Sequence, residues 1–167
     1  MKIVYDVLSS DLLNHIDEEM WENRRNRCWS SNYFTFNNPL RIGSMGNVLS
    51  KLLSDKLTNL VIEEIKSYVP SYKNIQIKCN LWLPNSGIAT HDDSNFEWAA
   101  TIYLNEEWDP NFGGWFIWLE DNDIWKTILP KRNLIVINDT QQIHCVTPVA
   151  HDSPDPRRTL QIWGLKS

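Results

Sequence analysis

The chain has 167 residues, of which 42% are hydrophobic and 22% are charged, and this fits one globular domain with a sizeable core. A net charge of −5 and a pI near 5.3 argue against a protein that binds a nucleic-acid backbone, which usually needs a basic face. The three cysteines include no CxxC pair, so we expect neither a disulfide framework nor a thiolate zinc site.

The N-terminal part of the chain is expected to be mostly helical. Residues 3–7 predict a short strand. A helix should follow, because Ser9 or Ser10 can cap its start and the next apolar residues recur at helical spacing. Residues 32–41 are expected to form a loop or a short strand. A second helix is predicted for about residues 47–68, where apolar residues form a stripe that a proline ends.

From residue 74 onward the apolar period changes to two, which is typical of strands. Residues 75–82 alternate as a half-buried strand. Further strands, separated by turn signals, are expected at residues 88–91, 97–104, 114–119, 124–129, 133–137, 144–149 and 157–164. About eight short strands indicate a closed or double-sheet β architecture. We therefore expect one mainly β domain over residues 1–167, with a helical cover at about 9–69 and a β core at about 74–165.

Two histidines and one aspartate form the most informative motif. Residues two apart on an extended segment point the same way, so His91 and Asp93 can face one metal ion while Asp92 points away. His144 opens a later apolar strand and is well placed as a third ligand. An H-x-D triplet alone more often marks a surface histidine beside solvated carboxylates. Two imidazoles and one carboxylate, however, are the ligand set of a non-haem Fe(II) site with open positions, and they favour iron, manganese or zinc over calcium or magnesium.

A basic pair follows the second histidine. A guanidinium binds a carboxylate through two parallel hydrogen bonds, so an arginine near the metal motif suggests an anionic companion of the metal. Strand alternation puts Arg157, Thr159 and Gln161 on one face and Arg158 on the other. Alternation alone leaves open which of the two arginines faces the metal.

Taken together, these motifs resemble the Fe(II)- and 2-oxoglutarate-dependent dioxygenase superfamily, within its prolyl 4-hydroxylase-like branch. The similarity covers roughly residues 75–163, more than half of the chain. The matching parts are the turn at 82–87, the triplet 91–93, the stretch 100–105, Trp108, residues 113–116, His144 with Val146, and residues 157–163.

The resemblance implies a double-stranded β-helix, the jelly roll of cupin-like proteins, flanked by two or three helices. By position, His91, Asp93 and His144 would be the catalytic iron ligands. Arg157 would pair with the distal carboxylate of 2-oxoglutarate, and Arg158 is the competing candidate.

Two further side chains are implied to hold the cosubstrate. Thr159 would add a hydroxyl to the distal carboxylate. Tyr103 matches a family position whose phenol reaches the cosubstrate, and a core aromatic on a central strand is the alternative interpretation. The chain departs from its relatives at Gln161, where they tend to have a small hydroxyl residue, and in the longer loop at 150–156.

The expected activity is that of a 2-oxoglutarate-dependent dioxygenase. It would hydroxylate an unactivated C–H of a protein side chain, prolyl included, or of a small amino-acid-like substrate, with release of succinate and CO2. The enzyme would need Fe(II), 2-oxoglutarate as cosubstrate and O2, with ascorbate as an optional reductant. The alternatives are a cupin-like metalloenzyme that does not use 2-oxoglutarate and a non-catalytic β-barrel binding module.

The expected partner is a small-molecule, peptide or protein substrate, with neither nucleic acid nor membrane involved. The chain has no apolar stretch long enough to span a membrane and no signal-like N-terminus, so we expect a cytoplasmic protein. The sequence leaves the prime substrate, the hydroxylated atom and the oligomeric state open.

Overall fold

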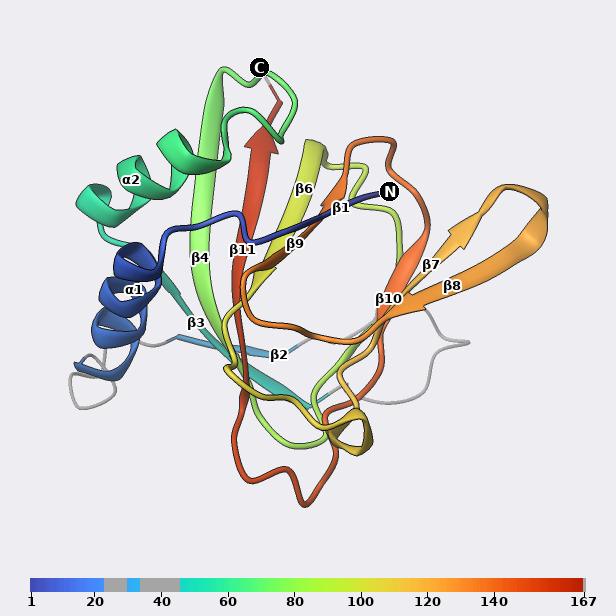
Figure 1. The fold of residues 1–167 in the computed structure, drawn as a ribbon. Helices are drawn as coiled ribbons and strands as arrows, with labels where there is room; N and C mark the ends of the chain where they lie inside the picture. The colour runs from blue at the N-terminus through green and yellow to red at the C-terminus, as the bar shows by residue number, and fades with distance from the viewer. Residues whose placement is uncertain (23–29, 34–45, 167) are drawn as a thin grey trace.

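The structure is a computed structural model that describes residues 1–22, 30–33 and 46–166 (Figure 1). The helices are α1 (Ser10–Glu22) and α2 (Asp55–Ile65), with the short 3-10 helices η1 (Pro110–Phe112) and η2 (Asp121–Asp123). The strands are β1 (Lys2–Tyr5), β2 (Ser30–Tyr33), β3 (Asn47–Leu52), β4 (Asn74–Trp82), β5 (Ile88–His91), β6 (Phe96–Tyr103), β7 (Phe116–Glu120), β8 (Ile124–Ile128), β9 (Leu134–Asn138), β10 (His144–Val146) and β11 (Arg157–Leu165).

Within the described residues the strands form two sheets. A seven-stranded sheet has the order β1-β9-β6-β11-β4-β3-β2, and a four-stranded sheet has the order β5-β10-β7-β8. Each strand pairing is antiparallel, and the central strand β11 pairs with β4 and β6, both far from it in sequence. This is a double-stranded β-helix, so the prediction of a mainly β jelly roll with N-terminal helices is confirmed.

Both helices cover the outer face of the seven-stranded sheet, next to β3 and β4, while the β7–β8 hairpin projects on the opposite side (Figure 1). Apolar residues at helical spacing, such as Leu12 and Ile16 on α1 and Val61 on α2, are buried in one cluster with Leu160 and Ile162 of β11. Burial of these apolar faces holds the helices to the sheet. In the described residues no helix is long and apolar enough to cross a membrane.

Serine side chains begin both helices, as the sequence led us to expect for α1. The Leu12 N–H donates to Ser9 Oγ at 3.4 Å, so Ser9 rather than Ser10 caps α1. The Leu57 N–H donates in the same way to Ser54 Oγ at 3.4 Å. Each cap satisfies one of the backbone donors that a helix start leaves without a partner.

The second helix is shorter than predicted, and residues 47–52 form β3 instead of its first turns. These residues pair with β4, with Val48 opposite Trp82 and Ser50 opposite Asn80. The leucine spacing imitates a helical stripe, but Leu52 is 61% exposed, so the stripe does not share one buried face. Of the predicted loop or strand at 32–41, residues 32 and 33 belong to β2, and the rest lies outside the described residues.

Candidate active site

A cavity of about 770 Å³ lies between the two sheets. One wall comes from β3, β4, β6, β9 and β11 of the seven-stranded sheet, and the other comes from β5, β7 and β10. Several sequence-predicted site residues line it, namely His91, Asp93, His144 and Arg157. The cavity therefore collects side chains from segments that are far apart in the sequence.

Three of these side chains converge. His91 ends β5 and His144 begins β10, and the two residues pair directly across these strands. The Asp93 carboxylate lies with Oδ1 3.5 Å from His91 Nε2 and with Oδ2 3.3 Å from His144 Nε2. Asp92 is exposed, and its carboxylate accepts a hydrogen bond from the Ser94 N–H at 2.9 Å. The structure thus brings Asp93, and not Asp92, together with the two histidines.

The reason for this arrangement differs from strand alternation. Asp93 lies two residues beyond the end of β5 and has a φ of 57°, so the segment has already turned. A positive φ is uncommon for residues other than glycine, and aspartate tolerates it better than most. The turn, rather than a continued pleat, directs the carboxylate back to the imidazoles.

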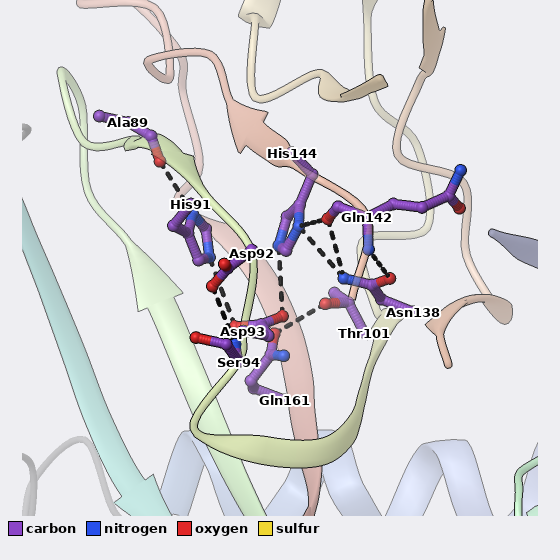
Figure 2. Close-up of polar contacts among 10 residues, drawn as sticks. All are labelled: Ala89, His91, Asp92, Asp93, Ser94, Thr101, Asn138, Gln142, His144 and Gln161. Carbon is purple, nitrogen blue, oxygen red and sulfur yellow. Dashed lines mark hydrogen bonds and ion pairs between the residues drawn. The ribbon is translucent and has the colours of Figure 1, made fainter. Parts of the chain in front are cut away.

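Backbone carbonyls orient both imidazoles (Figure 2). His91 Nδ1 lies 2.8 Å from the Ala89 carbonyl, and His144 Nδ1 lies 2.9 Å from the Gln142 carbonyl. A carbonyl can only accept, so each Nδ1 carries a proton, and Nε2, which faces Asp93, is the nitrogen that can bind a metal once it has lost its own proton. Buried Asn138 fixes the second contact, because its Nδ2 donates to Gln142 O at 3.1 Å and its Oδ1 accepts from Gln142 N–H at 2.8 Å.

These orienting residues were missed by the sequence analysis. Nothing in the local pattern around Asn138 distinguishes it from a turn asparagine, and only the return of the chain at Gln142 reveals its contact. Partners of this kind set the tautomer and ring direction of metal-binding histidines.

The electrostatics of the three side chains suit a cation. Burial opposes ionisation of Asp93, but its hydrogen bonds with His144 and His91 outweigh burial and hold the pKa of Asp93 well below its usual value. Burial likewise opposes protonation of His91, but the Asp93 and Ala89 hydrogen bonds outweigh it and raise the pKa of His91. One potential ligand atom from each of the three residues lies within 4.8 Å of the others, close enough to hold one metal ion with positions left open.

Arg157, the first residue of β11, is a buried cation in the same cavity. It is 1% exposed, and its Nε and Nη1 make no hydrogen bond with any described residue. The guanidinium carbon lies 4.9 Å from the Trp82 ring centre and 5.0 Å from that of Tyr103. Burial lowers the pKa of Arg157. A buried charge whose Nε and Nη1 have no hydrogen-bond partner among the described residues is costly, so these donors point to an anionic ligand.

The neighbouring arginine has a different environment. Arg158 Nη1 donates to Asp17 Oδ1 of α1 at 2.6 Å, and Arg132 holds the second oxygen of Asp17 at 2.9 Å. Arg158 therefore lies on the helix-covered face of the sheet, as strand alternation predicts. Of the two candidates, only Arg157 lines the cavity.

Thr159 and Tyr103 lie opposite each other on β11 and β6, beside Arg157. Thr159 is fully buried, and its Oγ1 accepts a hydrogen bond from Trp82 Nε1 at 3.0 Å. The Tyr103 hydroxyl is buried and makes no hydrogen bond within the described part of the chain. Burial raises the pKa of Tyr103, so the phenol stays neutral and keeps its proton to donate.

Gly114 leaves the space that the Arg157 side chain occupies. A Cβ at this position would lie 2.7 Å from Arg157 Cδ, and the residue has a φ of 66°. Both the contact and the backbone conformation favour glycine here.

Asn105 fixes the start of β11. Its Nδ2 donates to the Pro156 carbonyl at 3.1 Å, and its Oδ1 accepts from the Arg158 N–H at 2.6 Å. The two bonds bracket Arg157 and hold its backbone from both sides. The buried Asn105 side chain, just beyond the end of β6, therefore sets the position of Arg157 on β11.

Comparisons with known proteins agree with this geometry. A model of the 2OG-Fe(II) oxygenase superfamily matches residues 76–164. A Pseudomonas putida prolyl-4-hydroxylase structure has a TM-score of 0.71 and 16% identity, over 99% of this chain and 92% of the other. A Trichoplax adhaerens prolyl hydroxylase, in complex with a peptide fragment of the hypoxia inducible factor oxygen degradation domain, has a TM-score of 0.73 and 13% identity, over 98% and 82%.

A 2OG-Fe(II) oxygenase family oxidoreductase from Burkholderia pseudomallei has a TM-score of 0.71 and 15% identity, over 96% of this chain and 83% of the other. No curated protein matches the chain significantly. The structural likeness supports the fold, and the family model spans more than half of the chain. The chain therefore belongs to the 2OG-Fe(II) oxygenase superfamily, a family of 2-oxoglutarate-dependent dioxygenases.

Proposed function

We propose that this protein hydroxylates an unactivated C–H of an amino-acid-like substrate, free or within a peptide, and converts 2-oxoglutarate to succinate and CO2. One observation carries the proposal: a triad of metal-ligand type lines the same cavity as a buried arginine that has no hydrogen-bonded anion among the described residues. The first fits Fe(II), and the second fits the cosubstrate that the family uses.

We assign the metal to His91, Asp93 and His144. Their donor atoms are the two imidazoles and one carboxylate that suit Fe(II) and leave coordination positions open. When bound, the iron supplies the activation of O2 at those positions. The residues contribute a fixed geometry, because the carbonyls of Ala89 and Gln142 hold both rings with Nε2 directed at Asp93.

We assign the distal carboxylate of 2-oxoglutarate to Arg157. A carboxylate there would satisfy the Nε and Nη1 donors that are buried without a partner among the described residues. The Tyr103 hydroxyl is the adjacent neutral donor. Thr159 lies opposite Tyr103 and two residues along β11 from Arg157, where its hydroxyl could donate to the same carboxylate. A metalloenzyme that used no anionic cosubstrate or substrate would leave these donors unsatisfied.

The cavity also brings aromatic side chains to the space beside the metal ligands. Phe116 packs against His144, with ring centres 5.1 Å apart, and Phe96 and Trp163 line the same space. Excluding water around the reacting atoms protects the chemistry from side reactions. The Trichoplax neighbour holds a peptide, which supports a peptide as one of the two substrate classes.

Succinate formation tests the proposal. The protein would be incubated with Fe(II), 2-oxoglutarate, O2 and ascorbate, with and without a panel of amino acids and proline-containing peptides. We expect substrate-stimulated succinate release that His144→Ala abolishes, together with loss of anaerobic Fe(II) binding. Full Fe(II) affinity in His144→Ala would refute the ligand assignment. Absence of both 2-oxoglutarate binding and succinate formation in the wild type would refute the proposed reaction.

A further inference from the structure

The cavity contains a second cation, Lys78, at some distance from Arg157. Lys78 lies on β4, the strand that pairs with β11, where Trp82 is opposite Arg157 and Lys78 is opposite Gln161. Four residues along a strand span about 13 Å. The backbone positions of the two cations therefore lie about that far apart along one wall of the same cavity.

An aromatic ring, and no acid of the described residues, lies beside the Lys78 ammonium. Its Nζ lies 5.6 Å from the ring centre of Trp163, within the range of a cation–π contact. Trp163 in turn packs against Phe96, with ring centres 5.4 Å apart. No ion pair joins Lys78 to a carboxylate of the described residues.

The side chains beside Lys78 on this wall, Asn80 and Gln161, are polar. Gln161 accepts a hydrogen bond from Thr101 Oγ1 at 2.7 Å through its Oε1, so its amide N–H groups stay available to a ligand. Asn80 accepts from Ser50 Oγ at 2.6 Å, again through its side-chain oxygen. Both amides therefore present donors on a wall that also carries a cation.

The charges of the cavity balance without Lys78. Among the described residues that line it, Asp93 is the only acid. A divalent metal on Asp93 and two neutral imidazoles leaves one positive charge, and Arg157 adds another. The two carboxylates of 2-oxoglutarate neutralise both. Lys78 then remains as one positive charge without an anion.

We propose that Lys78, together with the Phe96–Trp163 wall, binds a carboxylate of the prime substrate, so that the substrate class is carboxylate-bearing. This inference rests on the proposed function, which assigns 2-oxoglutarate to the Arg157 end. The carboxylate belongs either to a free amino acid or to an acidic side chain of a peptide. Lys78 is then a specificity-determining residue and takes no part in holding the cosubstrate.

A binding experiment tests the inference without turnover. Benzoate is a suitable probe, because its ring can stack on Trp163 while its carboxylate reaches Lys78, and benzamide is its neutral match. Titration calorimetry would use anaerobic protein loaded with Mn(II) and saturated with 2-oxoglutarate, so that Arg157 is occupied. We expect benzoate to bind, benzamide not to bind, and Lys78→Gln to weaken benzoate by about 10- to 100-fold. Lys78→Arg should restore much of the affinity.

The chain offers a matched control in Lys131, whose Nζ lies 5.3 Å from the Tyr5 ring centre and which does not line the cavity. Lys131→Gln removes the same kind of contact and should leave benzoate binding unchanged. Benzoate that fails to bind the loaded protein, or binds Lys78→Gln equally well, would overturn the inference alone. A large loss of 2-oxoglutarate affinity in Lys78→Gln would also overturn it. Failure of 2-oxoglutarate to bind the wild type would instead overturn the proposed function, and the inference with it.

Succinate release separates the two carboxylate sources. One arm compares free amino acids with their amides, and the other compares the capped peptides acetyl-Gly-Glu-Pro-Gly-amide and acetyl-Gly-Gln-Pro-Gly-amide. Stimulation by the acid of either pair, with a raised KM and a retained kcat in Lys78→Gln, supports the inference and identifies the source. Equal stimulation by acid and amide in both arms would refute it.

Discussion

Replacing Arg157 should make the unliganded protein more stable while it disables cosubstrate binding. Burying a charge costs several kcal/mol even after relaxation. The Trp82 and Tyr103 rings at 4.9 and 5.0 Å offset at most about 2 kcal/mol each. Methionine fills a similar space without a charge, so we expect Arg157→Met to stabilise the ligand-free protein by roughly 1 kcal/mol. For a chain of this size the melting temperature then rises by about 2–4 °C.

The order should reverse when 2-oxoglutarate is added. Removing one partner of a buried charge pair costs about 2–5 kcal/mol, or roughly 30- to 4,000-fold in Kd. A ligand at 100 times its Kd stabilises the wild type by about 2.7 kcal/mol, or some 5–10 °C. The variant should gain less than about 1 kcal/mol at the same concentration. Calorimetric melting with and without 2-oxoglutarate, in the presence of Mn(II), measures both effects.

Arg158→Met is the matched control, because it removes the same side chain from the opposite face of β11. It breaks the 2.6 Å contact with Asp17, so it should lower the melting temperature and keep the full response to 2-oxoglutarate. The reasoning fails if Arg157→Met melts below the wild type without ligand. It also fails if that variant keeps the full stabilisation by 2-oxoglutarate.

Three further changes probe the site. Asn138→Ala removes the clamp on the Gln142 carbonyl and should lower Fe(II) affinity by about 10- to 100-fold in anaerobic titrations; a change below about twofold would contradict this. Fe(II) must displace a proton from His91, whose pKa the Asp93 hydrogen bond raises above 6.5 despite burial. The apparent affinity for Fe(II) should therefore fall by up to about tenfold per pH unit below that raised pKa. An Fe(II) affinity that does not change between neutral and mildly acidic pH would contradict this. Gly114→Ala places a Cβ 2.7 Å from Arg157 Cδ at a φ of 66°, so it should cost about 1–3 kcal/mol of stability. It should also weaken 2-oxoglutarate binding measured by calorimetry, and an unchanged Kd would show that the Arg157 side chain adapts.

The sequence predicted the β core well, because turn residues separate its strands and because β7, β10 and β11 alternate between buried and less buried residues. The period of two in residues 75–82 corresponds to β4, and the H-x-D triplet with the later His144 corresponds to side chains that converge in the structure. The strand β3 was predicted as a helix, because leucines at positions 49, 52 and 53 also fit a helical stripe. Pairing with β4, which decides the matter, is a long-range contact that local periodicity does not contain.

The sequence predicted the site only through those residues whose type alone indicates a chemical role. Histidine, aspartate and arginine are informative in themselves, whereas the role of Asn138 depends on where the chain returns at Gln142. Lys78 was overlooked for a similar reason. A lysine within an alternating strand is normally assigned to the solvent face, and only the opposing sheet turns that face into a cavity wall.

The two hydrogen bonds of Asn105, with Pro156 and Arg158, should keep Arg157 in place whatever the length of the preceding loop. If residues are inserted at 150–155, β11 can still begin at these two hydrogen bonds. Arg157 then returns to the same place in the cavity. We therefore expect this loop to tolerate changes in length, or an inserted peptide, without movement of the guanidinium. It is a place where related enzymes can differ and where a binding element can be added by design.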